Sequence, residues 1–330
     1  MENHEIDLSQ SLNNEGVILF LNGQIEEAIA KYRQAIAAEP DNASAHNNLG
    51  FALAQQGDFE QASEHYRLSL ELDPENDNTW LNLGNLKMMS GDYSGARDLF
   101  ENALNITRDI ANVWESYAKL MTISDDPSAA VNAWQQALRI HPHSPDYHLE
   151  LGIALIADGK HSQAIYHLQE VLYQDQENIR ANLSLGIVHL IQQNYGLSQQ
   201  FLKKVLGIEP ENSSARYHLA MNYLSTHNEP LAIQELERIL IMYPNDLTTM
   251  SDLAVVYLAT DQAGRARALI DKCLKLNPEH PKAAYYNALI DHIEKRFQES
   301  HRKLSNLVTQ NPPVYGAKAK QYLDTYFSTF

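Results

Sequence analysis

The chain has 330 residues, of which 44% are hydrophobic, and it carries 42 acidic against 25 basic residues, a formal net charge of −17. This length and apolar content suffice for a large buried core, and the excess of acid argues against nucleic acid as the main partner, because binding phosphates needs a basic surface. With only 14 glycines and 12 prolines, the composition favours helix.

Targeting and redox features are sparse. The first residues, MENHEIDLSQSLNNEG, contain neither a basic nor an apolar segment, so we expect no secretory signal. No stretch approaches the roughly 18 consecutive apolar residues of a transmembrane helix, so no membrane span is expected. The single cysteine, Cys273, can form no internal disulfide and fits a reducing compartment. These features favour a cytoplasmic protein.

Prolines recur along the chain in a fixed phase. Every gap between them is 34 or 68 residues, and the two slots without proline hold Arg108 and Gln176. The prolines of this series are Pro40, Pro74, Pro142, Pro210, Pro244, Pro278 and Pro312. Such a period indicates a repeat architecture.

Three further slots keep the same phase. Twelve and twenty-four residues before each proline slot the chain has only Gly, Ala or Ser, and eight residues before it there is always a large apolar residue. The small residues would let two helices approach closely, and the large one would fill the space between them. We number the positions of each repeat from 1 to 34, with Ser9 as the first.

This pattern resembles the tetratricopeptide repeat, W-x2-L-G-x2-Y followed by A-x3-F and P. The third repeat shows it as Trp80, Leu83, Gly84, Ala96 and Phe100. Nine repeats cover residues 9–314 without insertion. The resemblance implies an all-α, right-handed superhelical solenoid of helix-turn-helix pairs, here called helix A and helix B, that binds proteins in a concave groove lined by helix A.

At the start of the chain, residues 1–8 are polar and are expected to be frayed. Repeats one to four, residues 9–144, are acidic: residues 1–150 contain 24 acids and 8 bases. One interpretation is that these charges keep helix faces solvated; the other is that they attract a basic partner.

The inward positions of the first three repeats are rich in asparagine. Stacked amides would form a ladder that can pair with a peptide backbone whatever its sequence, or they are merely solvated. The ladder resembles that of O-linked N-acetylglucosamine transferases, which implies peptide holding; sugar transfer is not implied, since their catalytic domain has no counterpart in these residues. The candidate peptide-binding residues are Asn13, Asn14, Asn47, Asn48, Asn82 and Asn85.

Repeats five to nine, residues 145–314, carry apolar residues at the same inward positions. They predict an apolar strip that is a binding groove, a self-interface or partly packed core. Its members are Ile153, Ile156, Ile187, Leu190, Met221, Leu224, Val255 and Leu258. The core residues also change near residue 144, from aromatic with small to aliphatic with larger, which indicates drift between duplicated blocks or a flexion point.

Residues 315–330 predict a C-terminal capping helix with one aromatic face. That face is expected to cover helix B of repeat nine and consists of Tyr315, Ala319, Tyr322, Leu323, Tyr326, Phe327 and Phe330.

Catalytic and metal motifs are not found in the sequence. The Lys and Arg clamp with which related repeats hold a C-terminal carboxylate is missing from repeats one to three, and His161 and His167 share no helix face. Cys273 lies at a core slot and Asp125-Asp126 at a turn. We therefore expect no enzyme activity, no cofactor and no metal.

The functional prediction is a non-catalytic adaptor or scaffold that holds a peptide or helix of a partner protein. That partner would be basic where it meets the N-terminal half and apolar where it meets the C-terminal half. Two alternatives stay open: a structural scaffold that forms homo-oligomers, and a specificity subunit of an enzyme complex.

Overall fold

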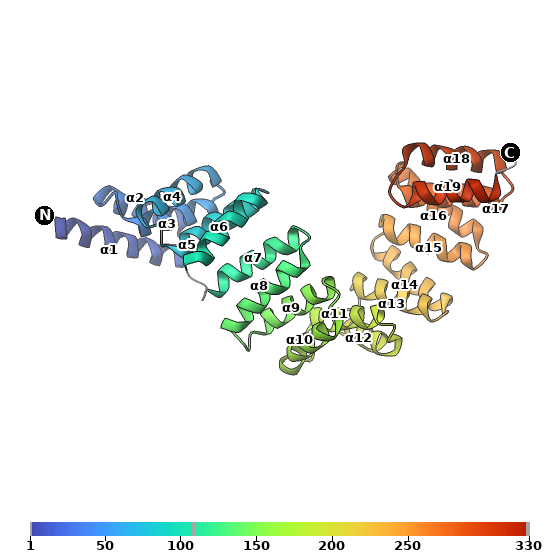
Figure 1. The fold of residues 1–330 in the computed structure, drawn as a ribbon, viewed down its shortest axis with the longest axis horizontal. Coiled ribbons are helices and arrows are strands. Elements are labelled where there is room, and N and C mark those ends of the chain that lie inside the picture. Colours follow the sequence, from blue (N-terminus) through green and yellow to red (C-terminus); the bar gives the residue numbers. More distant parts are fainter. Residues whose placement is uncertain (1, 107–109, 328–330) are drawn as a thin grey trace. The chain divides into compact units, whose positions relative to one another are not determined.

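The computed structural model describes residues 2–106 and 110–327, with the side chains of residues 2–7 left aside, and within them it contains nineteen α-helices and no strand (Figure 1). The chain divides into two compact units, residues 1–174 and residues 175–330. The described helices are nine helix A–helix B pairs followed by one more helix. The all-α solenoid predicted from the repeat is therefore confirmed.

The first unit contains five pairs. Their bounds are α1 Glu2–Leu21 with α2 Ile25–Ala38, α3 Ala43–Gln55 with α4 Phe59–Leu72, α5 Asp77–Met89 with α6 Tyr93–Ile106, α7 Ala111–Ile123 with α8 Pro127–Ile140, and α9 Pro145–Ala157 with α10 His161–Gln174.

The second unit contains four pairs and the final helix. Their bounds are α11 Ile179–Ile191 with α12 Tyr195–Ile208, α13 Ser213–Ser225 with α14 Glu229–Met242, α15 Leu247–Ala259 with α16 Ala263–Leu276, α17 Pro281–Ile293 with α18 Phe297–Gln310, and α19 Tyr315–Tyr326.

From the second repeat onward, helix A always fills positions 1–13 and helix B positions 17–30. A polar residue at position 34 starts most helices A, because its side chain accepts a hydrogen bond from the backbone N–H three residues later. Asn42, Asn76, Ser144, Asn178, Asn212, Asp246 and His280 all make this contact. Helix α1 differs, since it begins at Glu2 and so makes helical the residues expected to be frayed.

Each pair is held by a close contact between position 8 of helix A and position 24 of helix B. A Cβ atom built on Gly84 would lie 2.5 Å from Cε1 of Phe100, and one on Gly16 would lie 2.5 Å from Cε1 of Tyr32. The residues at position 24 are almost entirely buried. The small and large slots of the repeat thus meet as predicted, and they set the distance between the two helices.

The turn between helix A and helix B needs a left-handed residue at position 15. Gly57 has φ of 85°, and Gln193, at the same position, has φ of 62°. Nine repeats use this conformation, four with glycine and five with another residue. A non-glycine residue is strained there, which identifies five places where local stability is below its optimum.

The division between the units does not coincide with the seam expected near residue 144. A single apolar core extends across that point, from Leu81 to Ala164, and the rings of Trp134 and Tyr147 lie 5.8 Å apart. The change of core residues therefore lies inside the first unit, whose packing is continuous there.

The second unit ends in the capping helix α19. Its Ala319 and the adjoining Phe327 are buried against Leu304 and Leu307 of α18, and Tyr285 of α17 joins the same cluster. The cap thus packs on both helices of repeat nine. The last member of its predicted aromatic face, Phe330, lies outside the described residues.

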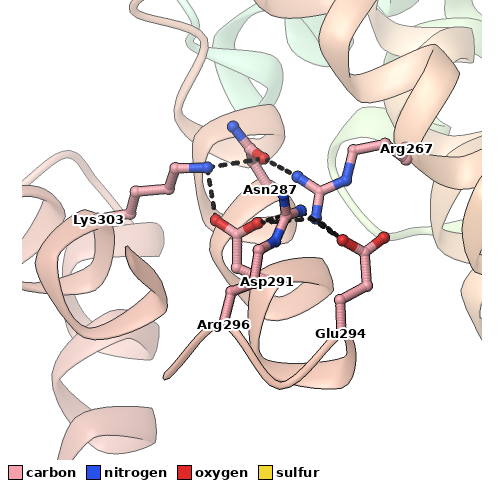
Figure 2. A network of polar contacts seen from close by, with 6 residues as sticks. All are labelled: Arg267, Asn287, Asp291, Glu294, Arg296 and Lys303. Carbon is pink, nitrogen blue, oxygen red and sulfur yellow. Dashed lines mark hydrogen bonds and ion pairs between the residues drawn. The ribbon is translucent and has the colours of Figure 1, made fainter. Parts of the chain in front are cut away.

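A polar network joins α16, α17 and α18 next to this cap (Figure 2). Asp291 is fully buried, and its carboxylate binds Lys303 Nζ at 2.5 Å, Arg296 Nη2 at 2.6 Å and Arg267 Nη2 at 2.7 Å. Asn287 accepts hydrogen bonds from Arg267 and Lys303 as well. Burial by itself raises the pKa of Asp291, but the hydrogen bonds from Lys303 and Arg267 outweigh it, so the pKa lies below its ordinary value.

We predict that Asp291→Asn destabilises α17 and α18 by about 3 kcal/mol, because it leaves three cations around a neutral group. A carboxyl with a lowered pKa stabilises the fold fully above its unfolded pKa of about 4. This stabilisation is lost as the pH falls through the pKa of the folded state. Hydrogen exchange of α17 and α18 at pH 7 and pH 3 measures both effects. The control, Glu294→Gln, removes a more exposed member of the network and should cost much less; equal losses would contradict the central role of Asp291.

We also predict that Gln193→Gly stabilises the second unit by about 1 kcal/mol, since glycine adopts a positive φ without strain. Gln192 is a matched control: it is the same residue one position earlier, and its φ is −78°. Gln192→Gly should destabilise the unit by about 0.5 kcal/mol. Urea denaturation of the three proteins checks the signs, and a loss of stability in Gln193→Gly would refute the strain.

Candidate functional site: the helix A face

We use the term helix A face for the inward positions 2, 5, 6, 9, 12 and 13 of each helix A. In the first unit this face brings four of the six predicted asparagines together in two pairs. Asn48 Nδ2 donates to Asn13 Oδ1 at 3.0 Å, and Asn82 Nδ2 donates to Asn47 Oδ1 at 3.0 Å. Each contact joins position 5 of one repeat to position 6 of the next. The amides therefore spend part of their hydrogen-bonding capacity on each other.

Each asparagine side chain has one acceptor oxygen and two N–H donors, so the groups that remain free to bind a ligand can be counted. Asn48 and Asn82 each donate one N–H in these contacts and retain a carbonyl oxygen and a second N–H. Asn14 is exposed and Asn85 is half-buried, whereas Asn13 is buried. Of the six predicted asparagines only Asn13 is buried, and the other five are at least partly accessible.

The same register is used in the second unit by other side chains. Tyr217 donates its hydroxyl to Asp252 Oδ2 at 2.9 Å, again from position 5 to position 6 of the next repeat, and Lys282 pairs with the same carboxylate. Burial and the contact with Asp252 raise the pKa of Tyr217 to about 12. The phenol is therefore neutral and acts as a donor at any physiological pH.

The predicted apolar strip is neither core nor fully exposed. All eight of its residues are half-buried, while their neighbours Leu155 and Leu185 are completely buried. Met221, Leu224 and Leu258 pack with one side against the core of the second unit. One side of the strip therefore packs against neighbouring helices and the other side is accessible; a binding groove and a self-interface on the accessible side both stay predictions.

Apolar residues also line the helix A face of repeats one to four, where the predicted site residues were asparagines alone. The rings of Phe20 and Phe51 lie 5.4 Å apart, and Phe51 is exposed. The same slots hold Val17, Phe20, Leu21, Phe51, Met88, Met89 and Ile123. Positions 9, 12 and 13 of repeats one to four carried this signal, which was overlooked beside the amides.

The net charge is confined to one unit. Residues 1–174 contain 26 acids and 9 bases, which gives −17, whereas residues 175–330 contain 16 of each, which gives zero. On the helix A face of repeats four and five, Glu115, Asp146 and Glu150 are acidic, and Lys119 pairs with Glu115 at 2.6 Å. The first unit therefore carries the net negative charge, and its helix A face is acidic at repeats four and five.

A set of contacts between repeats could not be predicted from the sequence. The side chain at position 4 donates a hydrogen bond to the carbonyl at position 32 of the preceding repeat. Trp80 Nε1 lies 2.9 Å from the oxygen of Pro74, and Asn182 Nδ2 lies 3.0 Å from that of Gln176. His46, His148 and Arg216 make the same contact. The residue types differ so much that only the geometry reveals the shared role.

Two of these position 4 residues belong to histidine pairs. His46 Nε2 lies 3.1 Å from the carbonyl oxygen of Pro40, so this nitrogen carries the proton, and Nδ1 of a neutral His46 accepts from His65 Nδ1 at 3.0 Å. His148 and His167 repeat the arrangement with the same distances. Each pair tolerates one added proton, whereas two would place N–H groups face to face.

The environment holds the second member of each pair neutral. Burial lowers the pKa of His65, and His46 and Arg33 lower it further against the opposing effect of Glu64. Burial and His148 likewise lower the pKa of His167 against Glu170. The pairs therefore favour the folded state when they are uncharged.

Within the described part of the chain, no helix is long and apolar enough to cross a membrane, and no three His, Cys, Asp or Glu residues are grouped as a metal site. Cys273 is buried in the core of the second unit, and burial raises the pKa of its thiol.

Comparison with protein families agrees with the geometry. A TPR repeat model matches residues 16–57, and tetratricopeptide repeat models match residues 43–76 and 122–188. The tetratricopeptide repeats predicted over these residues are thereby confirmed. No curated protein sequence matches the chain significantly.

Solved structures show the same fold. YrrB, described as a TPR protein with an unusual peptide-binding site, is 22% identical, with a TM-score of 0.52 over 56% of this chain and 95% of YrrB. The APC/C heterotetramer Cut9–Hcn1 is 19% identical, with a TM-score of 0.56 over 84% of this chain and 55% of the matched chain. PilF of Pseudomonas aeruginosa is 18% identical, with a TM-score of 0.56 over 64% of this chain and 97% of PilF.

We predict that acid destabilises the first unit through the histidine pairs. A histidine whose folded pKa is lowered stabilises the fold fully above its unfolded pKa of about 6.5, and that contribution decreases as the pH falls below it, by about 1.4 kcal/mol per unit of pKa difference. The double variant His65→Asn, His167→Asn keeps an N–H donor for each partner and removes the two imidazoles whose pKa is lowered. Its stability should change less between pH 7.5 and pH 5.5 than that of the wild type.

The matched control replaces the exposed His141 and His143 by Asn in the same unit. Melting of all three proteins at the two pH values measures the difference. A pH dependence that the control removes, or that the pair variant retains in full, would contradict a role for the histidine pairs.

Proposed function

We propose that this protein is a non-catalytic binding module whose helix A face holds a segment of a partner protein. The observation that carries the proposal is the half-buried or exposed apolar lining, which is present at positions 9, 12 and 13 in both units. Monomeric proteins rarely expose large apolar patches, and such patches usually mark surfaces that bind another protein. Peptide binding is also a use of this fold in YrrB.

In the first unit the occupant is a basic segment with apolar side chains. The position 6 amides of Asn48 and Asn82 would hydrogen-bond its backbone, and the apolar row that includes Phe51 would bind its side chains. A charge of −17 on this unit would attract basic residues and raise the association rate.

In the second unit the occupant is more apolar. The unit has no net charge, and the strip there consists of Ile187, Leu190, Met221, Leu224, Val255 and Leu258. An amphipathic helix would place side chains at i, i+3, i+4 and i+7 on such a row.

Self-assembly is the second candidate, because the same apolar row could bind another copy. The charge disfavours it for the first unit, since two faces of one strongly acidic unit repel each other. For the second unit, which is neutral, light scattering decides between a monomer and an oligomer. A specificity subunit of an enzyme complex is a particular case of partner binding and needs no other surface.

The proposal is tested with aspartate variants on the helix A face. Ile187→Asp with Leu224→Asp, and separately Phe51→Asp, should lower the affinity for a partner captured from native lysate by at least about tenfold. The helicity should stay unchanged because these residues are not core. Binding is measured by calorimetry with the purified partner.

Control substitutions lie on helix B. Ile241→Asp and Tyr173→Asp change residues that are 77% and 87% exposed, so they add the same charge away from the helix A face. Binding that survives the face variants, or that the controls weaken equally, would refute the proposed site. Unfolding of the Ile187 and Leu224 variant would show that the strip is core.

A further inference from the structure

We propose that a hollow on the helix A face of repeats four and five is an anchor pocket for one aromatic side chain, tryptophan or tyrosine, flanked by a basic residue in the partner segment. The inference rests on the proposed function and narrows the chemistry of the occupant. Three features of the hollow support this assignment: its volume, its apolar walls and the charged residues at its rim.

The hollow lies entirely within the first unit and has a volume of about 500 Å³. Its walls are mainly apolar: Met88 of α5, Ile123 of α7, Trp134 of α8, and Ile153, Ala154 and Ala157 of α9. Pockets of a few hundred Å³ with apolar walls and a few polar groups suit small ligands and single large side chains. An apolar cavity of about 150 Å³ already accommodates benzene.

Two small residues open this space. Thr122 occupies position 12, where the repeats before and after have Met88 and Ile156. Ala157 occupies position 13, where the preceding repeat has Ile123. The apolar row of the face is therefore interrupted at repeats four and five by a depression, and large apolar side chains stand around it.

The base of the hollow is rigid. Trp134 is 3% exposed and packs in the core that extends across repeats three to five, and Ala130 beside it is buried as well. Asp126 caps α8, and Pro127 is its first residue, which fixes the start of this helix. A preformed pocket on rigid helices loses little conformational entropy when it binds a side chain.

The rim selects the charge of the occupant. Lys119, Asp125 and Glu150 line the hollow, and Lys119 already pairs with Glu115. Two carboxylates against one cation make the rim acidic, in a unit that is acidic throughout. An indole N–H or a phenol O–H could donate to such a carboxylate, and a neighbouring lysine or arginine would be attracted to it. An aliphatic side chain would pack against the apolar walls but could form no hydrogen bond with the rim.

Three fluorinated indole probes test the pocket with the full chain. In ¹⁹F NMR, 5-fluoroindole should broaden on binding, the cationic 5-fluorotryptamine should bind about threefold more tightly, and the anionic 5-fluoroindole-3-acetate should bind more weakly. Ala157→Trp, which fills the hollow, should abolish the broadening. Asp125→Asn with Glu150→Gln should keep binding of 5-fluoroindole and remove the preference for the cation.

Ala37→Trp is the matched control. Ala37 is exposed at position 29 of helix B, a position where Tyr173 shows that a large side chain is tolerated. This variant should bind the probes as the wild type does. No broadening with the wild type, or equal broadening with Ala157→Trp, would overturn the pocket, and binding without a preference for the cation would overturn the basic neighbour.

The captured partner separates this inference from the proposed function. Ala157→Trp should lower its affinity at least about tenfold, while Ala37→Trp leaves it unchanged. If Phe51→Asp weakens the partner and Ala157→Trp does not, the helix A face binds and the anchor pocket is wrong. If neither the face variants nor Ala157→Trp have an effect, the proposed function itself fails.

Discussion

The structure depends on the contact between a very small residue at position 8 of helix A and a large one at position 24 of helix B. At Gly84 and Phe100 the approach leaves no room for even one more carbon atom. The same close contact recurs at the other four glycines of position 8, and the remaining four pairs have alanine there, so a small residue at position 8 lets the two helices approach closely. Each repeat then presents its remaining faces to the next in the same register.

That regular register explains both what holds the repeats together and what they expose. Side chains 35 residues apart meet, as Asn13 with Asn48 and Tyr217 with Asp252 show. The position 4 side chain reaches the turn of the preceding repeat. These contacts use one edge of helix A, so positions 9, 12 and 13 remain only half-covered. Apolar surface therefore stays accessible at these positions, and it is this surface that the proposed function assigns to the partner.

The two units apply the same architecture to different electrostatics. The first unit concentrates the acidic residues, whereas the second satisfies its charges internally, most completely at Asp291 with its three cations. Desolvated ion pairs of this kind stabilise only when every partner is present. The first unit instead carries the whole excess of carboxylates, which repel one another.

The repeat and its phase follow from the sequence alone, because proline and the small and large residues recur at fixed positions. The sequence also determined which residues form the core, since the slots at positions 8, 20 and 24 need a particular size. The apolar row of repeats one to four is also visible in the sequence, at positions 9, 12 and 13, although only the asparagines were predicted there as binding residues.

The contacts between side chains of different repeats are known only from the tertiary structure. The amide pairs, the histidine pairs and the Asp291 network depend on distances between residues that no local rule relates. The hollow at repeats four and five arises from Thr122 and Ala157, whose small size has meaning only beside Met88, Ile123 and Ile153. The physical reason is the same in each case: periodicity specifies the direction of a side chain, whereas a contact or a cavity is set by the sizes of neighbours from several repeats at once.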